Sequence, residues 1–139
     1  MIAVVLLLII NVYLYMTTTE PMKLRLVKER YKTLRENVEG TEFEKLKHPI
    51  PITAHHRLKG TVGYNLNKGA EIGLCIDGEV NEIFHVLIHE LAHSLVSEFD
   101  HSKKYWETYN RLKDHCIRLN IYESIPTETP FCGMHVQDK

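Results

Sequence analysis

Two histidines and a glutamate in the run His89-Glu90-Leu-Ala-His93 carry the clearest chemistry in the sequence. In a helix of 3.6 residues per turn, His89 and His93 lie one turn apart on one face, so both imidazoles reach a single Zn²⁺ ion at about 2.0–2.1 Å. Glu90 lies beside that ion without binding it, where its carboxylate can take a proton from a water held at the metal. The pattern therefore predicts a zinc site with Glu90 as general base.

A catalytic zinc needs a third protein ligand and an open fourth position. An unbroken helix would place His101 about 18 Å along the axis from His89, far out of reach of the same ion. The chain must therefore turn near residues 98–100, and Ser102 can cap the helix that follows such a turn. His101 is the preferred third ligand. The alternatives lie on the following helix and are Glu107 and His115.

The helix that carries this motif is predicted from about Glu82 to Ser97, with Asn81 as its N-cap. Apolar residues flank the motif on nearly every side, which indicates a helix buried in the core. Two histidines and a glutamate in such a place carry a heavy desolvation cost unless a metal or a polar partner compensates them. A bound metal supplies that compensation. The alternative is a pair of hydrogen-bonded core histidines with a salt-bridged glutamate.

Other segments predict the elements that position this helix. An amphipathic helix begins at Pro21 and ends before Gly40, and an extended segment follows with prolines that disfavour a helix. Two strands form an antiparallel hairpin, and a second long helix presents an apolar face containing Tyr105 and Trp106. The fold class is α+β with a small antiparallel sheet. The extended segment is 43–52, the strands are 60–64 and 71–76, and the last helix is 102–119.

Residues 2–16 form an apolar run with Asn11 as its only polar member. As a helix, this run covers about 22 Å, or about 27 Å with the three threonines that follow, which is a marginal span for a bilayer core of roughly 30 Å. Basic residues from Lys23 to Arg35 follow it and favour the cytoplasmic side. The sequence predicts a membrane anchor over residues 1–19 and a catalytic domain over residues 20–139. A hydrophobic helix buried in the domain or in a partner is the alternative.

Composition and net charge limit the number of domains, the partners and the cellular compartments that the sequence predicts. The chain has 139 residues, which suits one domain, and its net charge of −1 makes nucleic acid an unlikely partner. Three cysteines cannot form a complete disulfide framework and suggest a reducing, cytosolic compartment. Cys75 is predicted to be a packed thiol in a strand, and Cys132-Gly-Met-His135 to be a turn with a buried thiol rather than half of a metal site.

His89-Glu-Leu-Ala-His93 followed by His101-Ser-Lys-Lys-Tyr-Trp106 resembles the motif of the WLM and SprT-like zinc metallopeptidases. The resemblance covers about residues 71–119 and implies a compact zincin domain in which His101 completes the zinc site. It also implies that Tyr105 and Trp106 pack beneath the site. The gap of seven residues between His93 and His101 is longer than the corresponding gap in the pattern of WLM domains. A glycine that usually assists the turn is also missing.

These features predict a metalloendopeptidase that acts on protein or peptide substrates. The strand Ala70–Ile76 precedes the motif helix, and an exposed edge there would pair with an extended substrate. An ordinary covered strand is the alternative. An additional donor to the substrate oxygen is expected, and Tyr64 or His85 could supply it. Two other functions stay open. One is a zinc-stabilised interaction module without catalysis, and the other is a protease that removes proteins from DNA.

Overall fold

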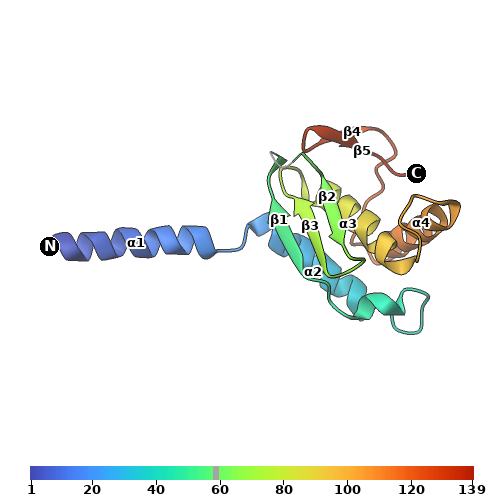
Figure 1. Ribbon diagram of the computed structural model, residues 1–139, viewed down its shortest axis with the longest axis horizontal. Helices are drawn as coiled ribbons and strands as arrows, with labels where there is room; N and C mark the ends of the chain where they lie inside the picture. Colours follow the sequence, from blue (N-terminus) through green and yellow to red (C-terminus); the bar gives the residue numbers. More distant parts are fainter. Residues whose placement is uncertain (58–59) are drawn as a thin grey trace.

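A computed structural model describes residues 1–57 and 60–139 of the chain, which form an α+β fold of four helices and two small sheets (Figure 1). The motif helix α3 and its neighbour α4 lie on one side of a three-stranded sheet, and a two-stranded hairpin lies near the C-terminus. The elements are α1 (Ile2–Thr18), α2 (Met22–Glu36), the short 3₁₀ helix η1 (Glu44–Lys47), β1 (Ile52–His55), β2 (Gly63–Leu66), β3 (Glu71–Cys75), α3 (Val80–Leu95), α4 (Lys103–Arg118), β4 (Thr129–Phe131) and β5 (Met134–Val136).

The larger sheet has the strand order β1-β3-β2, so β3 lies in its centre. β2 runs antiparallel to β3, as expected, but β1 runs parallel to it, with Ile52 opposite Ile72. The sheet is therefore mixed, and the expectation of a purely antiparallel sheet is wrong. The alternation of apolar and polar residues in a strand reports which faces are buried and carries no information on the direction of its partner.

The segment expected to be extended throughout 43–52 instead contains η1 before it enters β1. Pro49 follows the last residue of η1 by two positions, so it ends this helical turn without preventing it. In α2, the buried residues recur at spacings of three and four as the sequence predicted. They are Leu24, Val27, Tyr31 and Leu34.

α3 is the central element, because it packs against α2, α4, both strands of the hairpin β2–β3, and β5. Ten of its sixteen residues are buried. Its N-cap is Glu79 rather than Asn81, whose side chain instead pairs with both backbone groups of Glu123. The predicted cap is therefore wrong, because Asn81 serves a long-range contact. α4 follows its prediction, with the Ser102 hydroxyl accepting a hydrogen bond from the Tyr105 N–H at 3.2 Å.

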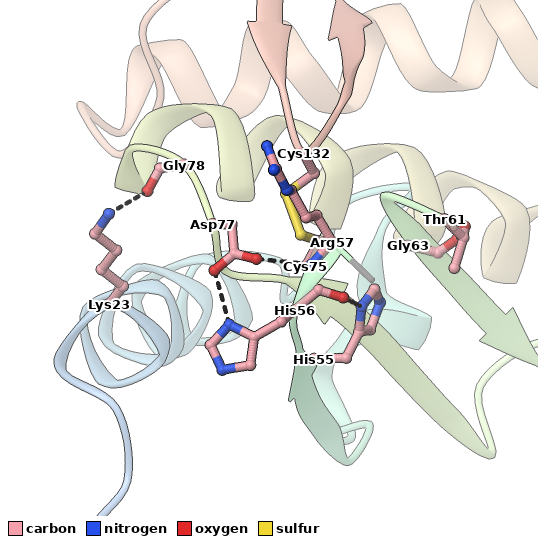
Figure 2. The surroundings of a disulfide bond; sticks show 10 residues. All are labelled: Lys23, His55, His56, Arg57, Thr61, Gly63, Cys75, Asp77, Gly78 and Cys132. Atoms are coloured by element: carbon pink, nitrogen blue, oxygen red, sulfur yellow. Dashed lines mark hydrogen bonds and ion pairs between the residues drawn. A yellow bond between two sulfur atoms is a disulfide. The ribbon is translucent and has the colours of Figure 1, made fainter. Parts of the chain in front are cut away.

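A disulfide joins Cys75, at the end of β3, to Cys132 in the turn between β4 and β5 (Figure 2). The predictions of a packed thiol at Cys75 and a buried thiol at Cys132 are wrong. The pairing escaped notice because 57 residues separate the two cysteines and no local pattern links them. Cys116 is the free cysteine and is buried in α4. The disulfide fastens the C-terminal hairpin to the end of the central strand.

α1 stands away from the packed body and has no buried residue (Figure 1). Its side chains are apolar around the whole circumference, and its few hydroxyl and amide groups bond to carbonyls of the preceding turn. Among the described residues, no single helix combines the length and hydropathy needed to cross a bilayer. The bent pair α1 and α2 meets that requirement by length and composition.

Candidate active site

Three histidine side chains converge at the end of α3. His89 and His93 come from successive turns of α3, and His101 reaches back to them from the loop before α4. The Nε2 atom of His101 lies 3.0 Å from that of His89 and 3.1 Å from that of His93. The structure thus brings the preferred third ligand to the other two.

These short distances fit a shared cation better than a set of hydrogen bonds. A neutral imidazole has one N–H, so mutually close Nε2 atoms cannot all satisfy one another as donors and acceptors. Ligands around a tetrahedral zinc at 2.0–2.1 Å are about 3.4 Å apart, close to the separations of His101 from its neighbours. Three imidazole nitrogens that meet at one point are a donor set well suited to Zn²⁺.

The charge states of His89 and His93 also suit metal binding. Burial, followed by the neighbouring histidines, lowers the pKa of His89 to about 3. Burial, followed by His101 and Lys68, lowers the pKa of His93 to about 4. Both rings are therefore neutral near pH 7 and offer an unprotonated nitrogen, which is the form that ligates a metal.

Glu90 lies beside this cluster, and its side chain is the acidic group closest to it on α3. The residue is 7% exposed, and burial raises the pKa of its carboxyl to about 7. A carboxyl group with such a pKa can both take and release a proton near neutral pH. Gly63 lets β2 approach α3 closely beside Glu90, because a Cβ there would lie 2.5 Å from a Val86 methyl. Glu90 contributes to the lining of two cavities, one on each side of it.

Two lysines, one from η1 and one from the turn between β2 and β3, close the C-terminal end of α3. Lys68 donates to the carbonyls of Val96 at 2.7 Å and Glu98 at 2.5 Å, and more weakly to that of His93 at 3.3 Å. Lys45 donates to the Ser94 carbonyl at 2.6 Å. These contacts satisfy carbonyl groups that a helix end leaves unpaired and place positive charge at the negative end of its dipole. They hold the reversal that returns the chain toward His101.

The aromatic pair of α4 packs directly on the histidines. The Tyr105 ring stacks on His93 with 4.3 Å between centroids, and its hydroxyl donates to the His89 carbonyl at 3.0 Å. The Trp106 ring stacks on His101 with 5.4 Å between centroids. These contacts fix the imidazole planes, in keeping with the packing role expected for the pair.

The other ligand and donor candidates lie elsewhere. His115 bonds to the Asn37 carbonyl at 3.0 Å, and Glu107 pairs with Lys103 within its own helix at 3.8 Å. The Tyr64 hydroxyl donates to Glu71, and its ring covers Gly73 on the opposite face of the sheet from α3. Tyr64 is therefore wrongly placed to contact a substrate oxygen at the cluster.

Comparisons with known proteins bear on this arrangement. Residues 42–129, well over half of the chain, match the WLM domain family. The chain belongs to the WLM domain family. In fold, it is similar to two crystal structures of Wss1 from Saccharomyces cerevisiae. One, a mutant, has a TM-score of 0.56 at 19% identity and covers 74% of this chain and 86% of that one. The other has a TM-score of 0.54 at 22% identity and covers 74% and 85%.

Two viral proteins are similar in sequence. The chain is 31% identical over 85 residues to uncharacterized protein R325 of Acanthamoeba polyphaga mimivirus, over 54% of this chain and 43% of that protein. It is 30% identical over 84 residues to uncharacterized protein 136R of Invertebrate iridescent virus 6, over 53% and 47%. The chain thus matches less than half the length of either relative.

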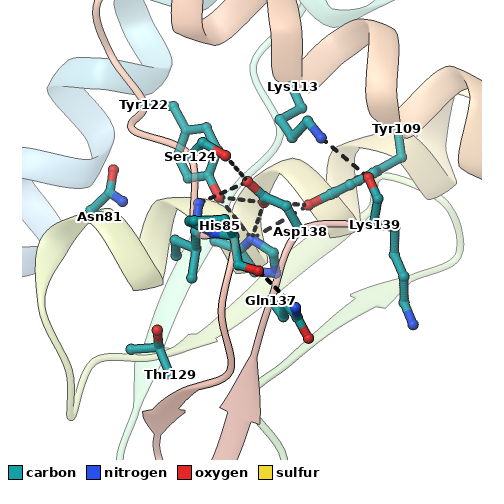
Figure 3. A network of polar contacts seen from close by, with 12 residues as sticks. Asn81, His85, Tyr109, Lys113, Tyr122, Ser124, Thr129, Gln137, Asp138 and Lys139 are labelled. Atoms are coloured by element: carbon teal, nitrogen blue, oxygen red, sulfur yellow. Dashed lines mark hydrogen bonds and ion pairs between the residues drawn. The ribbon is translucent and has the colours of Figure 1, made fainter.

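A buried polar network that sequence reasoning missed is centred on Asp138, which lies beyond residue 129, where the WLM match ends (Figure 3). At its centre, the Asp138 side chain is 7% exposed and lies 3.1 Å from Nδ1 of His85. The Tyr122 and Tyr109 hydroxyls donate to the same carboxylate at 2.6 and 3.2 Å. Burial raises the pKa of Asp138, but hydrogen bonds, chiefly from His85 and Tyr122, outweigh it and hold the pKa well below its ordinary value. Asp138 is ionised, and it anchors the tail.

His85 is therefore a member of this network rather than of the histidine cluster. Its Nδ1 faces the Asp138 carboxylate and the Tyr122 hydroxyl, which lies 2.9 Å away. Because both tyrosine protons point to Asp138, the remaining proton of the group belongs on Nδ1 of His85. No local signal in this WLM sequence could have revealed Asp138, since its partners come from three distant segments.

Proposed function

We propose that the chain is a zinc-dependent endopeptidase that hydrolyses peptide bonds in protein substrates. One observation carries the proposal. Three imidazoles meet at one point, and Glu90, a buried carboxyl with a pKa near neutrality, lies beside them and lines two cavities. Membership of the WLM family and the fold shared with Wss1 support a protease-type activity.

In this proposal, His89, His93 and His101 would hold the zinc ion. When bound, zinc would polarise the scissile carbonyl and make water a stronger nucleophile at neutral pH. Glu90 takes the proton of the attacking water and later delivers it to the leaving amine. Its low exposure limits competition from bulk solvent, and the pKa near 7 allows both halves of this transfer.

The substrate main chain would lie along β2. The expectation that β3 offers a free edge is wrong, because β3 pairs with a strand on each side. β2 is the edge strand beside the site: Gly63 lines the cavity on one side of Glu90, and Asn65 lines the cavity on the other. An extended peptide paired with this edge would place side chains in both cavities and its carbonyl near Glu90.

The Glu90→Gln variant of the full chain tests the proposal. We expect it to keep about one equivalent of zinc and to lose cleavage of an unfolded protein substrate by about 10²- to 10⁴-fold, because the amide cannot accept the proton. Metal content and cleavage are measured on the same sample. Cleavage equal to that of the parent would show that Glu90 is not the base. Zinc binding without any cleavage in the parent would favour the non-catalytic interaction module.

We also propose that residues 1–19 anchor the domain formed by residues 20–139 to a membrane. The support is the apolar and wholly exposed surface of α1, which the packed body leaves uncovered. The basic residues of α2 favour the cytosolic side, whereas the disulfide removes the argument from unpaired thiols. The redox state of Cys75 and Cys132 in intact cells, trapped by acid quenching and read out by alkylation of the denatured protein, tests the placement. Free thiols at both positions would support the cytosolic side, whereas the disulfide seen in the structure would place the domain in an oxidising compartment.

A further inference from the structure

A cavity of about 290 Å³ opens beside Glu90 and His89, toward the first half of α3. Val86 lines it from the helix, and the Trp106 ring lines it from α4. Its volume lies just below the range of pockets that hold a whole drug-sized ligand, so it suits one amino-acid side chain. In the proposed function, its position beside the reacting groups makes it a subsite for a substrate residue next to the scissile bond.

One wall of this cavity is the C-terminal segment 135–139, which is fastened at two places. The disulfide at Cys132 ties the preceding hairpin to β3. The Asp138 carboxylate is fixed beyond it by the network in Figure 3, including bonds at 2.8 Å from the Ser124 hydroxyl and the Ile125 N–H. This segment is therefore held in place and forms a fixed wall of the cavity.

Several of the side chains that line the cavity are lysine or histidine. Lys139 lines it with its Nζ 5.6 Å from the centre of the Trp106 ring, and no described carboxylate forms an ion pair with it. His85 and His135 also line it, and His85 has one nitrogen bound by Asp138 and the other without a partner in the described residues. Asp138 is turned into the network, which leaves Glu90 as the acidic residue of the lining.

We propose that this cavity is a substrate subsite that selects an acidic side chain, Asp or Glu, and that Lys139 provides the selectivity. The proposal rests on the endopeptidase function. A carboxylate entering the cavity would meet the Lys139 ammonium, which forms no ion pair within the described residues. A lysine or arginine side chain would be repelled by the positive charge of Lys139, because a charge beside a cleft disfavours side chains of the same sign.

Trp106 is the only tryptophan of the chain, so its fluorescence reports what enters the cavity. The probes are N-acetyl-glutamate methylamide and the isosteric N-acetyl-glutamine methylamide, each titrated into the full chain with and without chelator. We expect the glutamate probe to reach half-saturation at about three- to fivefold lower concentration, the effect of one partly exposed charge pair. Lys139→Met should remove this preference. Lys104→Met, on the same helix as Trp106 but outside the cavity lining, should retain it.

Equal half-saturation for the two probes would overturn the proposal, as would a preference that survives in Lys139→Met. A preference for the glutamate probe that disappears when the metal is chelated would also overturn the proposal, because the carboxylate would then be binding to the metal. Cleavage of a proteome-derived peptide mixture gives a second measurement: an acidic residue should be enriched at one position flanking the cut, and less so in Lys139→Met. Failure to cleave any peptide would count against the endopeptidase function alone, since the fluorescence titration needs no catalysis.

Discussion

His85 and His89 occupy the same face of α3 one turn apart, yet they do different things. His85 is held by Asp138 and two tyrosine hydroxyls in a network closed by the C-terminal tail. His89 has no acidic partner in the described part of the chain, and its Nε2 lies 3.0 Å from that of His101. The residue type and the helical spacing are identical in the two cases. The segments that arrive from elsewhere decide which histidine is a structural hydrogen-bonding group and which is free to ligate.

This difference divides α3 into two ends that should respond separately to substitution. The end near His85 should control the stability of the tail and the shape of one cavity. The end near His93, closed by Lys68, should control metal affinity. Variants at one end that leave the other unaffected support the division, and cross-effects would break it.

The largest effect is expected from His101→Ala. Loss of one of three protein ligands should weaken zinc binding by more than the 10- to 100-fold typical of removing a group that only orients a ligand. Competition with a chromogenic chelator measures the change. His85→Ala is the matched control on α3 and should keep the affinity of the parent. If Glu107→Ala or His115→Ala lost zinc instead, the third ligand would have been misplaced.

Asp138→Asn should come next in size. The amide keeps the shape of the side chain but leaves His85 and the tyrosines facing a poorer acceptor, so we expect a loss of about 2–3 kcal/mol in the free energy of unfolding. Urea denaturation measures the loss. Zinc affinity should change by less than about threefold, and a loss as large as that of His101→Ala would contradict the separation of the two ends.

The stabilisation from Asp138 should depend on pH. Its pKa in the folded protein lies below the ordinary value of 3.8, because hydrogen bonds to the carboxylate outweigh burial. Such a group stabilises the fold fully above the unfolded pKa, and this contribution is lost as the pH falls through the folded pKa. The gap in unfolding free energy between the parent and Asp138→Asn should therefore be constant from about pH 7 to pH 5 and should narrow below about pH 4. A gap that widened in acid would exclude an ionised Asp138.

The sequence contained most of the histidine cluster because its geometry is local. The spacing of His89 and His93 fixes their common face, and the distance argument for His101 requires the reversal that the structure has at residues 96–101. The Ser102 cap belongs to the same kind of inference, since a cap depends on residues three positions apart. Local geometry of this sort can be predicted from a single sequence without knowledge of the fold.

The features that escaped prediction all depend on segments that meet only in the folded chain. Cys75 forms a disulfide with Cys132, and His85 forms a hydrogen bond with Asp138, which lies 53 positions further along the chain. Asn81 appeared to be a helix cap and became a partner of Glu123 for the same reason. The burial predicted for α3 is confirmed, whereas hydropathy alone left α1 undecided between an anchor and a buried helix, and in the structure it is wholly exposed.

Lys68 gives the smallest effect and the sharpest test of how the metal end is held. Its ammonium binds carbonyls at the end of α3 and within the reversal, and it lies 4.4 Å from the centre of the Phe99 ring. In Lys68→Met, these carbonyls lose their donor, so the loop should sample positions in which His101 is displaced. We expect zinc affinity to fall by about tenfold, while the free energy of unfolding of the metal-free protein falls by about 1 kcal/mol.

Lys68→Arg distinguishes this positioning role from a general effect of charge. A guanidinium retains the positive charge but differs in reach and in the directions of its donors, so it should restore the stability more fully than the zinc affinity. Lys45→Met is the matched control, because Lys45 binds only the Ser94 carbonyl and does not touch the reversal. It should lower stability by a similar amount and leave zinc affinity within about twofold. Equal losses of zinc affinity in Lys45→Met and Lys68→Met would mean that the end of α3, rather than the loop, positions His101.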